Sequence, residues 1–388
     1  AVDLHDGWHF LHTAKHPAFT RLCLRAQKLR RPNSGLLAGP ETPPEIWEEL
    51  FDVWGRGVPC PSVYNEAAYR SGIRHGSDAK GADRDRFAFG GCTELMFEGC
   101  SNIGSTEGGL NLLDILNNST PSRFRADIRL RMEEFASAVR ANSEFAAQYR
   151  PQLIRTLFVD DCIDRNREFN AGGARYYGSI VNVAGLTDAA NSLAAMRGIP
   201  EKFGNDSPEV DEIARKLAHH VFSLIRRYPM RQGGPAYPAV ILLTGYAWHG
   251  SYVDASADGR PAGAPVVDSA GAVAGTDRNG PTALLNSVAK LPSRLGIGTL
   301  VLNVRLHRSL AASRTKRKLL KALLRGFFEQ GGLQLQPTLI DQETLKKAYE
   351  NPAAHPELIV RIGGYSEYYN RLSRELQFEV LKRTEHMI

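Results

Sequence analysis

Apolar positions recur along the chain with two different periods, and the elements that they predict alternate. Continuous or alternating apolar runs predict strands at residues 239–250, 298–306 and 333–340. Apolar positions that recur every three to four residues predict amphipathic helices at 123–150 and 313–328. Because strands alternate with helices, the pattern favours an α/β fold with mostly parallel strands.

Residues 1–40 begin with a helical pattern and then become polar, which predicts an N-terminal helical segment of unclear role. Helical histidine pairs can bind zinc. Gly7 interrupts the one histidine stripe in this segment and no acidic partner is obvious, so an ordinary surface stripe is the favoured interpretation. The histidines that form the stripe are His5, His9, His12 and His16.

The composition is that of a soluble globular protein, because 43% of the 388 residues are hydrophobic and 23% are charged. No apolar run reaches the length of a membrane span, and the first residues lack the apolar core of a signal peptide. We therefore expect a cytoplasmic protein without a membrane partner. The net charge of +6 is modest, and the basic residues of 313–328 fit the solvated face of a helix, so nothing supports a nucleic-acid partner.

The cysteines are odd in number and irregular in spacing, and no two of them form a CxxC pair. This pattern indicates a reduced chain and not a disulfide framework. Cys92 and Cys100 are not at a zinc-knuckle spacing. The five cysteines are Cys23, Cys60, Cys92, Cys100 and Cys162.

Near the C-terminus, two glycines separate an apolar run from a helical pattern. Residues 359–362 predict a short strand, and Ser366 is placed to cap a helix whose apolar face recurs from 369 to 380. On this local pattern, Gly363 and Gly364 form a tight turn. The flanking Arg361 and Tyr365 are left unexplained by a plain turn.

A second unusual site is the stretch "GGCTE", in which Cys92 follows two glycines and Glu94 lies two residues further on. A nearby carboxylate raises the pKa of a thiol, and no histidine base is adjacent, so the pattern does not suit a thiolate nucleophile. It suits a thiol that reacts by giving or taking a hydrogen atom while the carboxylate moves a proton. On its own, a Gly-Gly-Cys turn is more often structural.

The two unusual sites explain each other. Only glycine can form a Cα radical that becomes planar with no side chain in the way, and the adjacent amide and carbonyl delocalise the unpaired electron. A buried glycine beside a thiol could therefore store a radical and pass it to sulfur.

At these residues the chain resembles the glycyl radical enzymes, the group that includes pyruvate formate-lyase and the glycerol and choline lyases. "GGCTE" is similar to the thiyl loop of the Cys-x-Glu branch. "VRIGGYSEYYNRLSRELQFEVLKRTE" resembles the radical domain, in which the radical glycine precedes an aromatic residue, here Gly364 before Tyr365. "DDCIDRNREFNAGGARYY", "SADGRPAG" and "GTDRNGPTALLNSVAKL" follow in the order of the family.

The resemblance implies a ten-stranded α/β barrel with Cys and Gly finger loops that meet at its centre. Family members are much longer, so this chain corresponds to the second half of such a barrel. We expect the barrel half at residues 41–340, with the Cys loop near 90–94, and a glycyl radical domain at 341–388. A missing N-terminal half or a homodimer partner would complete the barrel, because a half barrel leaves strand edges unpaired.

The resemblance also assigns roles to residues. Gly364 holds the stored radical, Cys92 becomes the thiyl that takes hydrogen from the substrate, and Glu94 is the general acid or base. A separate activating enzyme that uses S-adenosylmethionine and an iron–sulfur cluster installs the radical, and no metal is expected on this chain.

Two positions depart from particular branches of the family. The diol dehydratases carry an Asp fourteen residues after the radical Cys, where this chain has Thr106 beside Glu107, which argues against polyol dehydration. Pyruvate formate-lyase has a second Cys where this chain has Gly91 or Thr93, which argues against acyl transfer to sulfur.

These residues favour a glycyl radical lyase that acts on a small polar organic molecule under anaerobic conditions, as a dehydratase, eliminase or decarboxylase. Formate C-acetyltransferase-like activity and a non-catalytic partner that only lends its radical domain stay open. A radical donor needs the Gly364 segment alone, whereas this chain keeps Cys92 and Glu94 as well, so the enzyme is favoured. No motif identifies the substrate.

Overall fold

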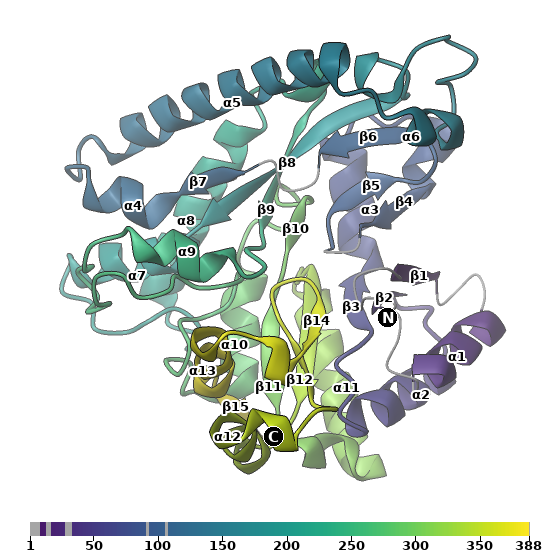
Figure 1. The fold of residues 1–388 in the computed structure, drawn as a ribbon. Helices are drawn as coiled ribbons and strands as arrows, with labels where there is room; N and C mark the ends of the chain where they lie inside the picture. The colour runs from purple at the N-terminus through teal and green to yellow at the C-terminus, as the bar shows by residue number, and fades with distance from the viewer. Residues whose placement is uncertain (1–7, 13–16, 28–32, 91–92, 105–107, 388) are drawn as a thin grey trace.

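A five-stranded parallel sheet forms the upper part of the molecule in Figure 1. The computed structural model describes residues 8–12, 17–27, 33–90, 93–104 and 108–387. In the central strand β8, eight of the nine residues are buried, as expected for a strand that is covered on both faces. The strands are β6 (Ser101–Gly104), β7 (Gly109–Asn111), β8 (Tyr176–Ala184), β9 (Ala236–Val240) and β10 (Thr299–Leu300).

A six-stranded sheet lies below it, in the order β1-β2-β3-β12-β11-β15. Its strand pairs are parallel except for β3 with β12, which is antiparallel. The α/β fold with mostly parallel strands is thus confirmed. The strands are β1 (Trp8–His12), β2 (Asn33–Ala38), β3 (Ser62–Asn65), β11 (Asn303–Leu306), β12 (Gln334–Leu339) and β15 (Glu385–His386).

One bend joins the two sheets. The run 298–306, which the sequence pattern predicts as one strand, is divided between β10 and β11 at Val301 and Leu302. The Val301 N–H donates to Val240 O of one sheet, and Leu302 O accepts from the Gln336 N–H of the other. The two buried side chains therefore belong to a corner and not to a straight strand, which the apolar pattern alone does not distinguish.

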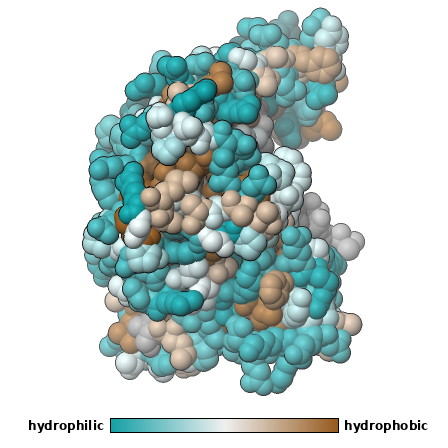
Figure 2. Space-filling view, turned by 90° about the vertical axis from the view of Figure 1, so that its left-hand side faces the viewer, coloured by the Kyte–Doolittle hydropathy of each residue, from teal (hydrophilic) through white to brown (hydrophobic). Residues whose placement is uncertain are grey.

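Helices cover the sheets, and the predicted amphipathic helices are present as α5 and α11. In α11 the buried side chains are Leu320, Leu324 and Phe327, and Ser313 caps the helix by accepting from the Lys316 N–H. In the described ranges, no helix combines the length and the apolar character needed to cross a bilayer. The face in Figure 2 is mostly hydrophilic, with apolar residues in small patches. The helices are α1 (Pro17–Ala26), α2 (Pro44–Gly55), α3 (Glu66–Gly76), α4 (Leu112–Asn117), α5 (Phe124–Tyr149), α6 (Leu153–Phe158), α7 (Leu186–Ala195), α8 (Pro208–Ile225), α9 (Gly245–Ser251), α10 (Gly280–Ala289), α11 (Arg314–Glu329), α12 (Gln342–Glu350) and α13 (Arg374–Lys382).

The prediction of a helical segment at residues 1–40 is wrong for much of its length. Among its described residues, 8–12, 17–27 and 33–40, only α1 is an α-helix, and β1 and β2 pair with each other in parallel as strands of the six-stranded sheet. The helical spacing of the histidines has no structural meaning, because His9 and His12 lie in β1, whereas His5 and His16 lie outside the described residues. Among the described residues, no three potential metal ligands come together.

The C-terminal pattern also needs correction. Ser366 does not cap a helix: it begins β14 (Ser366–Tyr368), which pairs with β13 (Ile359–Arg361) as an antiparallel hairpin. The cap of α13 is Ser373, whose hydroxyl accepts from the Leu376 N–H. The run 239–250 is likewise a strand only at its start, since α9 occupies its end.

The C-terminal segment has a small hydrophobic core of its own and lies against β11 and β12 (Figure 1, yellow). Its last strand, β15, pairs with β11, so both the core and the sheet hold the β13–β14 hairpin in place. The buried core residues are Ile340, Leu345, Ala348, Val360, Ile362, Tyr369, Leu372 and Val380.

Candidate active site

The β13–β14 hairpin turns through the two glycines, and each glycine is needed for a different reason. The Ile362 N–H donates to Tyr365 O at 2.9 Å, so Gly363 and Gly364 are the two central residues of the turn. Gly364 has φ +106°, which favours glycine. A Cβ on Gly363 would lie 3.0 Å from Leu243 N, so the turn packs directly against other backbone. Both glycines are buried.

Arg361 holds this turn by hydrogen bonds. Its side chain is 2% exposed, although a buried cation costs free energy unless polar groups surround it. The guanidinium donates to Gly364 O at 2.9 Å from Nη2 and to Gln336 Oε1 at 2.7 Å from Nε. The same Gln336 oxygen accepts from the Gly364 N–H at 3.2 Å.

The thiol of Cys60 lies at this turn. Cys60 Sγ is 3.1 Å from Ser366 Oγ and 3.3 Å from Arg361 Nη1, and Nη1 also donates to Ser366 Oγ at 3.0 Å. No motif separates Cys60 from the other cysteines, so the sequence alone gives it no role. The Ser366 hydroxyl is thus hydrogen-bonded to Arg361 and Cys60 and not to the first turn of a helix.

Gln336 was also missed, although the sequence contains a signal for it. In β12, Gln334, Gln336 and Thr338 alternate with apolar residues, and all three are buried. Polar side chains on one face of a fully buried strand are expected to have partners. Here Gln336 bonds the turn, and Thr338 Oγ1 accepts from the Arg361 N–H at 3.4 Å.

The hairpin is fastened from its other side by a second arginine. Arg383 donates to Arg361 O at 2.6 Å and to Asp268 Oδ2 at 2.5 Å. The backbone oxygen of Asp268 also abuts Gly363. The next residue back, Val267, donates its N–H to Asp188 Oδ2 at 3.0 Å, so the loop against the hairpin is tied to α7.

Glu94 closes the loop of a second hairpin, formed by β4 (Phe87–Phe89) and β5 (Leu95–Phe97). The Gly90 N–H donates to Glu94 O at 2.7 Å. Thr93 has φ +80°, a strained conformation for a β-branched residue, of the kind that clusters at functional sites. The Glu94 side chain is 4% exposed. Cys92 and Gly91 lie outside the described residues.

Tyr64 links the two hairpins. Its ring stacks on Phe89, next to the Glu94 loop, with the centroids 4.2 Å apart. Burial raises the pKa of Tyr64, the nearby Arg361 charge opposes this shift, and the Glu94 charge adds to it. Tyr64 therefore lies close enough to Arg361 of one hairpin and to Glu94 of the other to be affected by both charges.

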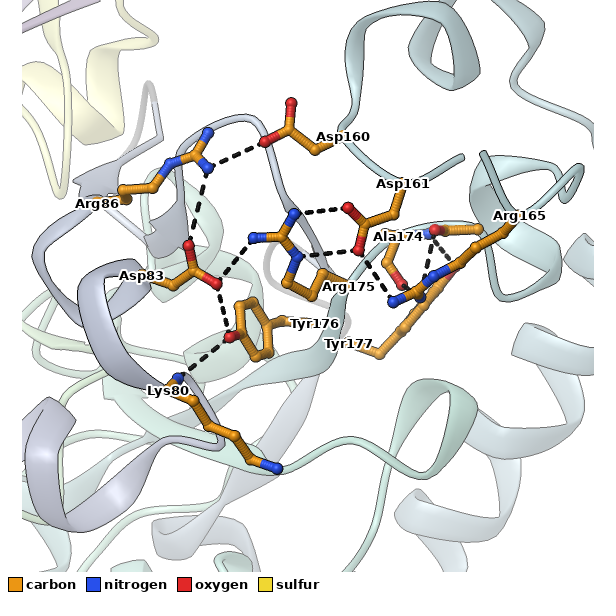
Figure 3. A network of polar contacts seen from close by, with 11 residues as sticks. Lys80, Asp83, Arg86, Asp160, Asp161, Arg165, Ala174, Arg175, Tyr176 and Tyr177 are labelled. Carbon is orange, nitrogen blue, oxygen red and sulfur yellow. Dashed lines mark hydrogen bonds and ion pairs between the residues drawn. The ribbon is translucent and has the colours of Figure 1, made fainter. Parts of the chain in front are cut away.

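An ion network braces the base of the Glu94 hairpin (Figure 3). Arg86, which precedes β4, bonds Asp160 at 2.9 Å. Arg175 connects Asp83 and Asp161 at 2.9 and 2.5 Å, and its hydrogen bonds lower the pKa of both carboxyls. The motif "DDCIDRNREFNAGGARYY" thus has a structural role here, because it supplies three of these residues.

Two family models match the chain. One, described as glycine radical, matches residues 266–370 and includes the β13–β14 hairpin. The other, described as pyruvate formate lyase-like, matches residues 121–199. Curated relatives include the probable dehydratase YbiW of Escherichia coli, which is 29% identical over 279 residues. Through these two segments, the chain matches the glycyl radical enzyme family.

The match covers only part of each curated relative. The trans-4-hydroxy-L-proline dehydratase of Clostridioides difficile is 28% identical over 272 residues, which are 62% of this chain and 34% of the relative. YbiW is matched over 61% of this chain and 34% of its own length. This chain thus spans about a third of the length of these curated relatives.

The fold agrees with solved glycyl radical enzyme structures. The B12-independent glycerol dehydratase from Clostridium butyricum superposes with a TM-score of 0.89 at 23% sequence identity. The match covers 96% of this chain and 55% of that chain. The identity is too low to carry a substrate or a residue role from one protein to the other.

Proposed function

We propose that this chain contains the radical turn and the thiol loop of a glycyl radical lyase of the Cys-x-Glu type. The observation that carries the proposal is the buried Gly363–Gly364 turn, in which both peptide groups of Gly364 are hydrogen-bonded. Support also comes from Tyr64, which stacks on Phe89 next to the Glu94 loop and is affected by the charges of both Arg361 and Glu94.

We further propose that strands from both sheets belong to the second half of a ten-stranded barrel. The match to 55% of a solved chain at a TM-score of 0.89 supports this arrangement. In it, residues 41–340 form the barrel half and 341–388 the glycyl radical domain, while β1 and β2 extend the six-stranded sheet. The rest of the protein, or a second copy, would pair the open strand edges.

The proposed roles divide the chemistry among three residues. A radical on Gly364 supplies one-electron chemistry that side chains cannot otherwise perform. The Gly364 radical takes the thiol hydrogen of Cys92, and the resulting thiyl takes a hydrogen atom from a substrate carbon and returns it to the product. The Cys92 thiyl then regains its hydrogen from Gly364, so turnover consumes no external oxidant. Glu94 moves the proton that accompanies loss of the leaving group. A radical S-adenosylmethionine enzyme would activate Gly364.

The substrate class is a small polar organic molecule, and the reaction is a dehydration, another elimination or a decarboxylation. Relatives named as a trans-4-hydroxy-L-proline dehydratase and an indoleacetate decarboxylase support this range. Formate acetyltransferase 1 of Escherichia coli is 31% identical over 234 residues, which keeps that activity as the second candidate. Thr93 argues against acyl transfer to sulfur, since no second cysteine comes directly after Cys92.

Replacement of Cys92 tests the division of roles. In the complete anaerobic protein, Cys92→Ala should abolish turnover and still allow the radical to be installed, because the thiol acts after the radical is stored. Electron paramagnetic resonance and a product assay would measure the two effects. Cys162→Ala, which removes a buried thiol elsewhere, is the matched control and should keep turnover. Activity in Cys92→Ala would mean that another thiol, such as Cys100, does this work.

A further inference from the structure

The peptide groups on both sides of the Gly364 Cα belong to one closed ring of hydrogen bonds. Its N–H donates to Gln336 Oε1 at 3.2 Å, and its carbonyl oxygen accepts from Arg361 Nη2 at 2.9 Å. Arg361 Nε closes the ring by donating to the same Gln336 oxygen at 2.7 Å. Two side chains thus hold the amide and the carbonyl that flank a single α-carbon.

The ring of hydrogen bonds costs folding free energy, which indicates that the orientation of the Gln336 side-chain amide matters. Gln336 is fully buried, and its Nε2 has no hydrogen-bond partner in the described part of the chain. Rotating the amide would offer nitrogen where both Arg361 and Gly364 need an acceptor, so the oxygen is fixed and the NH₂ group goes unpaired. A buried donor without a partner destabilises a fold, and such groups call for an explanation.

We propose that Gln336 and Arg361 are positioning residues that stabilise the unpaired electron on Gly364. The electron is shared between the amide nitrogen, which gives electron density, and the carbonyl, which withdraws it. The hydrogen bond from the Gly364 N–H to Gln336 increases electron release by the amide nitrogen. The hydrogen bond from the cationic guanidinium to the carbonyl oxygen increases electron withdrawal by the carbonyl. The same contacts fix the orientations of the two peptide groups that flank the α-carbon.

This inference rests on the proposed role of Gly364, but part of its test does not require the radical. Amide hydrogen exchange of the turn, followed by mass spectrometry in the unactivated complete protein, reports the Gly364 N–H bond. Gln336→Leu removes the acceptor and should speed exchange at Gly364 on the order of tenfold. Gln336→Glu keeps both acceptor contacts and should exchange at the wild-type rate.

Gln334→Leu is the matched control, because Gln334 is equally buried on the same face of β12 and its Oε1 accepts from the Leu302 N–H. It should leave Gly364 exchange unchanged. Equal exchange at Gly364 in wild type and Gln336→Leu, or an equal increase in Gln334→Leu, would overturn the proposal.

Paramagnetic resonance of the activated protein then tests the effect on the electron. Gln336→Leu and Arg361→Lys should each show a changed α-hydrogen splitting and a signal that decays about tenfold faster under anaerobic conditions. Gln336→Glu should show the wild-type splitting and the wild-type decay rate. A wild-type doublet with identical splitting and decay in every variant would refute the inference alone. Absence of the doublet in wild type would instead refute the proposed function, and the exchange result would stand.

Discussion

At the scale of single residues, the two glycines of the turn are not equivalent. Gly364 is required by its positive φ and by the chemistry proposed for its α-carbon, whereas Gly363 is required by space. The carbonyl oxygen of Asp268 and the backbone nitrogen of Leu243 lie within 3.2 Å of the place where a Cβ on Gly363 would be. Backbone atoms cannot move aside as a flexible side chain can.

Gly363→Ala should therefore destabilise the protein by roughly 1–3 kcal/mol, because the added methyl group has no room. Gly326→Ala is the matched control: this glycine lies within α11, and a Cβ there would meet nothing within 4 Å. It should stabilise the protein by up to about 1 kcal/mol through helix propensity. Urea unfolding of both variants would measure the changes, and equal effects would show that the turn can relax.

Glu94→Gln should slow the chemical step by about 10²–10⁴ and change substrate binding much less, since a general acid or base acts in the transition state. The near-identical shape of Gln keeps the Glu94 loop intact. Comparison of kcat with KM in the activated protein is the measurement. An unchanged kcat in a correctly folded variant would give Glu94 a structural role.

At the scale of elements, the sequence predicted long periodic segments well and short ones poorly. Helices α5 and α11 have strong patterns over many residues. Strands β1 and β2 are short, and their strand character depends on each other and on β3, which no local pattern reveals.

The candidate site was predictable where a motif marks it. Gly364 and Glu94 stand in recognisable stretches, whereas Gln336, Cys60 and Tyr64 reach the site only through tertiary contacts. The period-two polar residues of β12 are the one local signal that would have identified Gln336.

Asp188 provides an element-scale prediction, because it ties the start of α7 to the loop that packs on the hairpin. Burial raises the pKa of Asp188 to about 6, and the negative charge of Asp258 adds to this, while the bond from the Val267 N–H opposes it. Between about pH 4 and pH 6 the folded state therefore holds more protons than the unfolded chain, so this group's contribution to stability is lost as the pH rises through that window.

Asp188→Asn keeps the acceptor for the Val267 N–H and removes the titration. Relative to wild type, the variant should gain roughly 3 kcal/mol of unfolding free energy between pH 4 and pH 7. Denaturant unfolding at several pH values would follow the difference. A difference between the two proteins that does not change with pH would contradict a raised Asp188 pKa.

At the scale of the whole molecule, the substrate was beyond prediction for a physical reason. The chain covers only about a third of the length of these curated relatives. A substrate site is shaped by every segment that surrounds it. The Gly363–Gly364 turn, in contrast, is built largely from residues of this chain. Its main contacts come from β12, β13 and the C-terminal segment.

The most direct test of the account is the reaction of the activated complete protein with air. Before exposure, the anaerobic protein should show a paramagnetic doublet from the single α-hydrogen of Gly364. After exposure, the signal should disappear and the backbone should break at Gly364, releasing a C-terminal piece that begins at Tyr365, which mass spectrometry can identify. A break after Ile362 would instead assign the radical to Gly363. No doublet before exposure and no break after it would contradict the account and leave Gly363 and Gly364 as an ordinary turn.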